Sequence, residues 1–477
     1  MFLSSNMTCH SCVKTWPRKT CDRKRWRKKQ IVWYNVRDVK MTSSLDDYDF
    51  VQVLIHDIHG RPKGRLMAKR RMRGVFKNGL GLYGGVCFCG IRGEITIHED
   101  FGAKGNYANR YLKPLFNTLR PCPTLGQGRF KVGEVMCRLE TLDGTLDTST
   151  PRTAAEIQIE RLQNELGLTV KSAFEIEFNI RETGSKKYFG HINEWSATGV
   201  VEKCQDTLFD LIQVLGDRGV PVDSVQTEYG PGQFEFTLDV EEGITVADNT
   251  LNFKNIVKTF LKTKGFDASF MTRIDPSLGA SNGLHWNHSL WTSSGRNAFL
   301  DVNKPNKLSE LTCHWLAGLV EHSPAMTAFC NPTINCYRRI GQPWAPTYAD
   351  WNCHGRLSSY RVKVEGDNVY IENRLSTGAS NPYLVMVCSL AAGIDGVKRK
   401  LQLPKEGDKS VLLPTDLESA LQTLEADTVL TEAMGTKLVE YFTYCKRTYE
   451  VKEFAAFGKL SEEVQIEKEH EFYFFSV

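Results

Sequence analysis

The sequence predicts an α+β fold, and three observations lead to this class. Strand-like segments with one charged and one apolar face are separated by helical segments of apolar periodicity, without regular strand–helix–strand repeats. The chain has 477 residues, which is too long for a typical single hydrophobic core. Glycines gather between residues 74 and 105, as a small β-rich unit with long loops requires. We therefore expect a small N-terminal domain followed by a larger one.

The first segment, residues 1–45, is strongly basic. It carries nine Lys or Arg between Lys14 and Lys29 against one acid, Asp22. We interpret this arm as a solvated, disordered tail, and the alternative is a polyanion contact or a targeting signal. Its apolar start is far too short for a secretory signal. The net charge of the whole chain, +4, is too small to indicate a nucleic-acid partner.

Cysteine usage and hydropathy bear on the compartment. Fourteen cysteines are scattered without the dense spacing of a disulfide scaffold, which favours reduced thiols and a cytoplasmic location. The longest apolar run, residues 384–394, is about half the length that a membrane span needs. We expect neither a membrane nor a nucleic-acid partner.

Residues 46–148 are expected to form the N-terminal domain. The stretch "YDFVQVLIHD" at 48–57 alternates apolar and polar residues and predicts a strand, with "HGRPKG" turning the chain after it. A linker then leads into a helix that Thr150 can cap, that Pro151 suits as first residue and that Gly167 ends. We place the domain boundary here, so the second domain spans 149–477.

The second domain is predicted to combine further helices with four strands. The segment 249–265 ("NTLNFKNIVKTFLKTKG") has one apolar helical face and ends at Gly265. The four strand-like segments are "AFEIEFNI" (173–180), "GQFEFTLD" (232–239), "GLHWNHSLW" (283–291) and "VYIENRL" (369–375).

Carboxylates occupy one face of these strands. Glu175 and Glu177 are two residues apart and therefore point the same way, with Phe174, Ile176 and Phe178 on the opposite face. For one strand alone, a solvent-facing acidic stripe explains this equally well. Acids recur, however, near or within the other strands. If these faces meet, five carboxylates and one imidazole supply ligands for two divalent cations, Mg²⁺ or Mn²⁺, and the candidates are Glu175, Glu177, Glu228, Glu235, Glu372 and His285.

Arginines accompany the acids. Arg338 and Arg339 follow an Asn-Pro turn, and Arg356 and Arg361 lie in "WNCHGRLSSYRV". Arginine beside Mg²⁺-type ligands is typical of phosphoryl transfer, in which negative charge spreads over the phosphate oxygens. The chain has neither a Walker A loop nor a dinucleotide-binding glycine motif.

The order of these motifs resembles the glutamine synthetase family of the bacterial-type class, from about Asp46 to the C-terminus. The motifs are E-x-E-F, E-x-G-P-G-Q-x-E, G-L-H-x-x-x-S-L-W, N-P-T-x-N-x-Y-x-R, I-E-x-R-L and N-P-Y-L with A-A-G-I-D-G. Within the family the chain looks like the lengsin branch of eye-lens proteins and their invertebrate relatives. The resemblance implies a β-grasp-like N-terminal domain and a catalytic domain with a curved antiparallel sheet flanked by helices.

The resemblance also implies roles for individual residues. Glu177, Glu228 and Glu235 match the ligands of one metal, and Glu175, His285 and Glu372 those of the other. Arg339 and Arg374 match catalytic arginines that hold glutamate and the transferred phosphate. The positions matched to nucleotide or phosphate binding are Arg356, Arg361, Asn287 and Ser289. ATP, glutamate and an amine are the implied partners, and the implied assembly is a dodecamer of two hexameric rings.

Four positions depart from the family pattern. Asn287 replaces a second histidine, and Ala280-Ser281 replaces an Asn-Gly pair that grips glutamate. The flap "GQPWAPTY" is one residue shorter and lacks the glutamate that shields the γ-glutamyl phosphate, with Trp344 beside the gap. Tyr83 stands where an aspartate would deprotonate ammonium.

The departures leave three functions open. The first is an ATP-dependent ligase with altered acceptor, such as an organic amine. The second is a lengsin-like inactive scaffold that acts with cytoskeletal intermediate filaments. The third is nucleotide sensing without turnover. Removal of an Asp and a Glu deletes the charges that attract and deprotonate ammonium, so we expect weak or altered ammonia chemistry.

Overall fold

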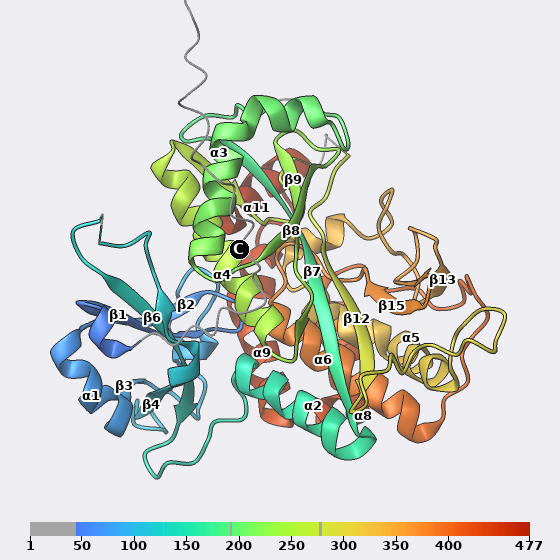
Figure 1. Ribbon diagram of the computed structural model, residues 1–477, viewed down its shortest axis with the longest axis horizontal. Coiled ribbons are helices and arrows are strands. Elements are labelled where there is room, and N and C mark those ends of the chain that lie inside the picture. Colours follow the sequence, from blue (N-terminus) through green and yellow to red (C-terminus); the bar gives the residue numbers. More distant parts are fainter. Residues whose placement is uncertain (1–43, 127, 191–192, 276–278) are drawn as a thin grey trace, which may run out of the picture. The chain divides into compact units, whose positions relative to one another are not determined.

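The computed structural model describes residues 44–126, 128–190, 193–275 and 279–477 (Figure 1). The described residues form one compact unit. The prediction for the basic arm falls outside the described residues, except at its last two positions. The fold is α+β, as the sequence predicts, with two sheets and a set of helices.

The first sheet has six strands in the order β2-β1-β6-β4-β3, with β5 also paired to β6. Strands β1 and β6 run parallel and the other pairs are antiparallel. Helix α1 (Lys69–Asn78) follows β2 and was not predicted. Half of the "HGRPKG" segment belongs to a strand instead of the turn, because β2 begins at Pro62. The bounds are β1 (Phe50–His56), β2 (Pro62–Ala68), β3 (Leu80–Tyr83), β4 (Asn109–Pro114), β5 (Arg120–Pro121) and β6 (Val132–Glu140).

The second sheet contains all four predicted strands, which are β7, β9, β12 and β15, among its nine strands. Its order is β13-β14-β15-β12-β7-β9-β8, with β10 and β11 also paired to β7 (Figure 1). Only β13 and β14 pair in parallel. The bounds are β7 (Leu168–Glu182), β8 (Val222–Thr227), β9 (Gln233–Leu238), β10 (Glu241–Glu242), β11 (Phe266–Ser269), β12 (Leu284–Thr292), β13 (Trp351–Cys353), β14 (Tyr360–Glu365) and β15 (Asn368–Asn373).

The two helices that the sequence predicts are present as α2 and α4. Helix α2 (Pro151–Leu166) starts at Pro151, and Gly167 closes it in the left-handed conformation. The Thr150 side chain does not cap it; it hydrogen-bonds Thr153 Oγ1 at 3.0 Å instead. Helix α4 (Thr245–Thr263) begins four residues earlier than predicted. The others are α3 (Thr198–Asp217), α5 (Glu310–Cys330), α6 (Pro382–Arg399), α7 (Leu417–Ala426), α8 (Thr428–Met434), α9 (Thr436–Lys446), α10 (Lys452–Ala455) and α11 (Glu462–Tyr473).

Helices α4, α5 and α6 cover the apolar face of the second sheet. The Phe178 ring of β7 lies 5.8 Å from that of Phe253 in α4. Trp315 of α5 donates its indole N–H to His288 Nε2 of β12 at 3.0 Å. Burial of these aromatic side chains fixes which face of each strand looks away from the helices. The predicted carboxylates lie on that other face. Among the described helices, none combines the length and apolar character required to cross a bilayer.

Candidate metal and nucleotide site

Register between the central strands gathers the predicted acids. His285 of β12 is paired with Glu175 of β7, and Glu177 of β7 with Glu235 of β9. On the other side of β12, Asn287 pairs with Glu372 of β15. Paired residues on one face of a sheet have Cβ atoms only about 5 Å apart. Residues from four distant parts of the sequence therefore meet on the face that the helices leave free.

Three of the predicted ligands form one tight group. His285 Nδ1 lies 3.3 Å from Glu175 Oε2 and 3.6 Å from Glu372 Oε1. The three side chains can offer ligand atoms within 4.8 Å of one another. His285 Nε2 is buried and has no hydrogen-bond partner among the described residues. A buried imidazole nitrogen without a partner, beside two carboxylates, supplies ligand types that a divalent cation uses.

This group also holds basic side chains. Arg361 Nη1 donates to Glu372 Oε2 at 3.2 Å, and Arg374 Nη1 donates to Glu372 Oε1. Lys363 Nζ lies 3.1 Å from Glu372 Oε2 and 3.5 Å from Glu175 Oε1. Burial opposes ionisation of Glu372, but Arg374, His285 and Lys363 together hold its pKa well below the ordinary value. The carboxylates of Glu175 and Glu372 are therefore ionised, and the basic side chains beside them balance their negative charge.

The other three predicted ligands lie in a different electrostatic environment. Burial and the neighbouring carboxylates raise the pKa of Glu228 to about 8 and that of Glu235 to about 9. Gln226 Nε2 donates to Glu235 at 2.9 Å and to Glu228 at 3.4 Å, and Trp195 hydrogen-bonds Glu228. The group includes no member of an ion pair among the described residues. Burial and repulsion keep Glu228 and Glu235 largely protonated at neutral pH, and a bound cation would relieve this repulsion. Arg339 acts electrostatically on Glu177 without an ion-pair contact.

Glycine at position 283 permits the approach of the two groups. A Cβ at Gly283 would lie 2.8 Å from His285 Nε2 and 3.2 Å from Glu177 Oε1. The Gly283 backbone N–H also donates to Glu177 Oε2 at 2.8 Å. Glycine thus leaves room for the imidazole and orients the carboxylate at once.

A cavity of about 320 Å³ adjoins the His285 group. Predicted nucleotide residues Asn287 and Ser289 line it, together with Glu175 and Lys363. Trp291 adds an aromatic wall, and Lys171 Nζ lies 4.2 Å from its ring centre. The aromatic surface and the hydroxyl and amide groups suit a nucleoside, and the two ammonium groups attract its phosphates. Four carboxylates also line the cavity, Glu175, Asp223, Asp239 and Glu365, so anion binding here falls to the lysines.

Of the five arginines that the sequence singles out, four are buried or half-buried and one is exposed. Arg338 pairs with Glu469 and Glu462 of α11 instead of the predicted ligands. Arg339 is buried and donates to the carbonyls of Arg374 and Leu375, at 3.1 and 3.3 Å. Burial lowers the pKa of Arg339 to about 10, which still leaves it charged at neutral pH. Arg374 donates to the Trp344 carbonyl of the flap at 3.3 Å. Arg356 is exposed, and within the described ranges it makes no ion pair with the acidic groups.

The positions that depart from the family pattern differ in their exposure and in the hydrogen bonds that they make. Tyr83 ends β3, and its hydroxyl donates to the Thr96 carbonyl at 2.6 Å. Burial raises the pKa of Tyr83 to about 12, so it is no base at neutral pH. Trp344 has a φ of 67° and a side chain that is 65% exposed. Asn287 donates to Glu175 Oε1 at 3.0 Å, so it supports a predicted ligand.

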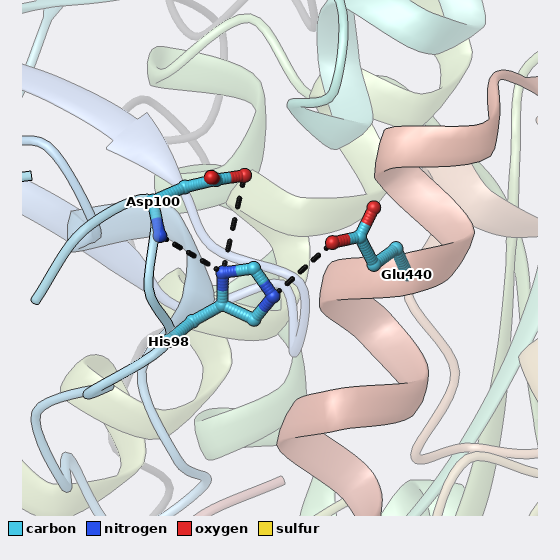
Figure 2. A group of neighbouring side chains, drawn as sticks. All are labelled: His98, Asp100 and Glu440. Carbon is cyan, nitrogen blue, oxygen red and sulfur yellow. Dashed lines mark hydrogen bonds and ion pairs between the residues drawn. The ribbon is translucent and has the colours of Figure 1, made fainter. Parts of the chain in front are cut away.

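A second group with metal-ligand residue types lies elsewhere. Figure 2 shows the His98 ring between Asp100 and Glu440 of α9, with His98 Nε2 3.2 Å from Glu440 Oε1. His98 Nδ1 accepts the Asp100 backbone N–H at 3.2 Å, which engages its lone pair. Lys437 already pairs with Asp100 at 2.9 Å and with Glu440 at 3.0 Å. We interpret this group as a structural clamp, because internal donors satisfy its acceptors.

Sequence reasoning missed several polar residues of the site. Lys363, Gln226 and Trp195 contact predicted ligands, yet none is part of a motif that identifies a metal centre. The signal available for Lys363 was strand alternation, since it lies two residues after Arg361 and shares its face. Trp195 lies in a loop, for which the sequence offers no such periodicity.

Comparison with known proteins gives consistent results. The family model for the glutamine synthetase catalytic domain matches residues 148–465. Glutamine synthetase of Methanococcus voltae is 27% identical over 428 residues, which are 84% of this chain and 92% of that protein. Glutamine synthetase of Clostridium saccharobutylicum is 29% identical over 400 residues, 81% of this chain and 85% of that protein.

Solved structures share the fold. A novel glutamine synthase homolog superposes with a TM-score of 0.79 at 24% identity, covering 90% of this chain and all of that one. A complex of GmaS with ADP superposes with a TM-score of 0.76 at 24% identity, covering 87% of this chain and 96% of that one. Two thirds of the sequence match the family model, in the region that holds every predicted ligand, and the chain therefore belongs to the glutamine synthetase family.

Proposed function

We propose that the protein is an ATP- and Mg²⁺- or Mn²⁺-dependent ligase that activates the γ-carboxylate of glutamate and joins it to an amine. The observation that carries the proposal is the convergence of six predicted ligands beside a cavity with nucleotide-binding character. Membership of the glutamine synthetase family supports the same reaction class. The fold neighbour GmaS binds ADP, which supports a nucleotide in this fold.

The residues present suit the divalent cations, which when bound would neutralise phosphate charge and polarise its oxygens. Glu177, Glu228 and Glu235 would hold one cation, and Glu175, His285 and Glu372 are the predicted ligands of another. Arg339 and Arg374 bind the glutamate carboxylate and the transferred phosphoryl group. Asn287, Ser289, Arg361 and, less closely, Arg356 bind the nucleotide end. Fixed guanidinium groups stabilise the charge that develops as the phosphoryl group moves.

The nitrogen acceptor is proposed to be an organic amine. Tyr83 is protonated at neutral pH and accepts no proton from ammonium. The flap lacks the shielding glutamate and carries Trp344 beside the gap, and the exposed Trp195 hydrogen-bonds Glu228. Aromatic side chains with few free charges favour a larger, partly apolar amine, which they contact through their ring faces.

The test is ATP turnover by the purified protein with Mg²⁺ and glutamate. Ammonium, hydroxylamine and polyamines are offered separately, and both phosphate and γ-glutamyl product are measured. We expect product with an organic amine at a rate well above that with ammonium. Glu228→Gln should reduce turnover at least about 100-fold, because it removes a proposed ligand. Background release of phosphate with every acceptor would contradict the ligase proposal.

A second candidate is a lengsin-like scaffold that acts with intermediate filaments. The loss of the ammonium-site acid at Tyr83 favours it, because a scaffold does not need this group. Co-sedimentation with assembled filaments, together with absent turnover, is the expected result for this candidate. In both cases we propose a cytoplasmic protein, a domain boundary near residue 148 and a dodecamer of two hexameric rings.

A further inference from the structure

We propose that Lys363 acts as a built-in cation in the His285 group, so that each chain takes up one divalent cation, at Glu177, Glu228 and Glu235, instead of two. Lys363 then contacts the nucleotide phosphates from the place where a second metal ion would do so. This inference rests on the proposed function, and it names a phosphate-binding residue that the predicted ligand set does not include.

The contacts of Lys363 place its ammonium group among the predicted ligands. Its Nζ lies 3.1 Å from Glu372 Oε2, 3.5 Å from Glu175 Oε1 and 3.4 Å from Asn287 Oδ1. Strand β14 pairs with β15, which brings Lys363 and Arg361 to the strand that carries Glu372. The side chain is 14% exposed, and its open side faces the 320 Å³ cavity. An ammonium group with three oxygen neighbours has the hydrogen-bond partners that its three donors require.

The two groups of predicted ligands differ in charge balance. Glu372 pairs with Arg361, Lys363 and Arg374, and Lys363 also pairs with Glu175. Two carboxylates thus contact three side chains that carry a permanent positive charge. A dication added here would lie within a few ångströms of Lys363, and like charges at that distance repel each other strongly.

The neighbouring group has no such cation. Glu177 accepts from the Gly283 N–H at 2.8 Å and from Gln233 Nε2 at 3.3 Å. Glu228 and Glu235 accept from Gln226, which is neutral. In the part of the chain that the structure describes, no Lys, Arg or His pairs with any of these three acids. Arg339 acts electrostatically on Glu177 but makes no ion-pair contact with it, so the oxygens of this group remain open to a divalent ion.

The position of Lys363 would also let its ammonium group bind the phosphates of a nucleotide. Asn287, Ser289 and Trp291 line the same cavity, so a nucleotide seated there would direct its phosphates toward the carboxylate groups. A lysine ammonium binds phosphate as a compact point charge on a flexible stem. Lys363 would meet the phosphates from its place beside Glu372 and Glu175, at the wall of the cavity.

The experiment counts manganese ions per chain in the purified full-length protein, by calorimetric titration and by electron paramagnetic resonance of free Mn²⁺. We expect one site in the natural sequence and two in Lys363→Met, with the second at least about 10-fold tighter than any weak binding in the natural sequence. Lys363→Arg should keep one site. Lys171→Met is the matched control and should also keep one site, because Lys171 lines the same cavity but lies over Trp291.

Titration with ADP in the absence of metal tests the second half of the inference. We expect Lys363→Met to weaken ADP binding about 10-fold or more, and Lys171→Met to weaken it less. Two manganese sites in the natural sequence, or one site in a folded Lys363→Met protein, would overturn the inference while leaving the ligase proposal intact. Lys363→Gln is the second neutral variant if the Met variant fails to fold. No manganese site at all would remove the metal centre on which both proposals depend.

Discussion

Gly283 is the residue on which the geometry of the candidate site depends most directly. Gly283→Ala is expected to lower Mn²⁺ affinity about 10-fold or more, because the added Cβ would lie 3.2 Å from Oε1 of the proposed ligand Glu177 and 2.8 Å from His285 Nε2. Its backbone φ is not in the left-handed region, so strain of the main chain is not the cause. Calorimetric titration of the variant with Mn²⁺ measures the effect.

The matched control for this substitution is Gly199→Ala. Gly199 lies in α3, where an added Cβ meets nothing within 4 Å, so this variant should bind manganese unchanged and be slightly more stable. Equal manganese affinity of Gly283→Ala and the natural protein would mean that Glu177 is not a ligand of this ion.

At the scale of secondary structure elements, helices α5 and α6 approach each other through glycines. A Cβ at Gly396 would lie 2.3 Å from the His314 carbonyl oxygen and 2.7 Å from the Gly318 Cα, which are backbone atoms that cannot move aside. Gly396→Ala is therefore expected to destabilise the protein by about 1–3 kcal/mol. Thermal unfolding followed by circular dichroism measures this, and the control is Gly216→Ala in the last turn of α3, where an added Cβ meets nothing within 4 Å. An unchanged melting temperature would show that the helices can separate at no cost.

A buried histidine joins three of the helices and makes stability depend on pH. His322 of α5 lies 2.6 Å from Asp427, which precedes α8, and 3.0 Å from Asp395 of α6, which Arg399 also contacts. Burial opposes protonation of His322, but the hydrogen bonds with Asp427 and Asp395 outweigh this effect and raise the pKa of His322. A raised pKa means that the folded state binds the proton more tightly than the unfolded state does.

The stabilisation from His322 is therefore complete below its unfolded pKa of about 6.5 and lost as pH rises through the folded value. His322→Gln should lower the melting temperature by several degrees at pH 6 and by less at pH 9. His314→Gln on the same helix is the control, since its carboxylate neighbour Glu310 is exposed. A difference between natural and variant protein that stays constant over this range would contradict the protonated state of His322.

Strand periodicity predicted which acids share one face of the sheet, but it did not predict which other side chains contact these acids. Glu175 and Glu177 lie opposite buried Phe174, Ile176 and Phe178, as alternation along a strand requires. Sequence could not indicate that Lys363 would reach Glu372, because that contact depends on the pairing of β14 with β15. Helix α1 was missed because its run of basic residues hides the two buried positions, Met72 and Val75.

At the scale of the whole molecule, the segment between β3 and β4 exposes apolar side chains in a regular pattern. Ile95 and Ile97 are 65% and 68% exposed, while Thr96 and His98 between and beyond them are buried. The Tyr449 hydroxyl donates to the Ile95 carbonyl at 3.0 Å, and the Tyr83 hydroxyl donates to the Thr96 carbonyl. A backbone that is fixed by hydrogen bonds and directs two isoleucine side chains into solvent is typical of a surface that a second chain covers.

We therefore expect these isoleucines to lie in an interface of the proposed dodecamer. Sedimentation velocity should give a species of about twelve times the chain mass of 54.0 kDa. Ile97→Glu should shift it to smaller species, because burial of a carboxylate in an apolar contact is costly. Phe209→Glu is the control, since Phe209 is 56% exposed on α3, far from Ile97 in the sequence. If Ile97→Glu keeps the large species while Phe209→Glu loses it, the interface lies on α3. If the natural protein sediments as a monomer that still binds manganese, the metal site is complete within one chain.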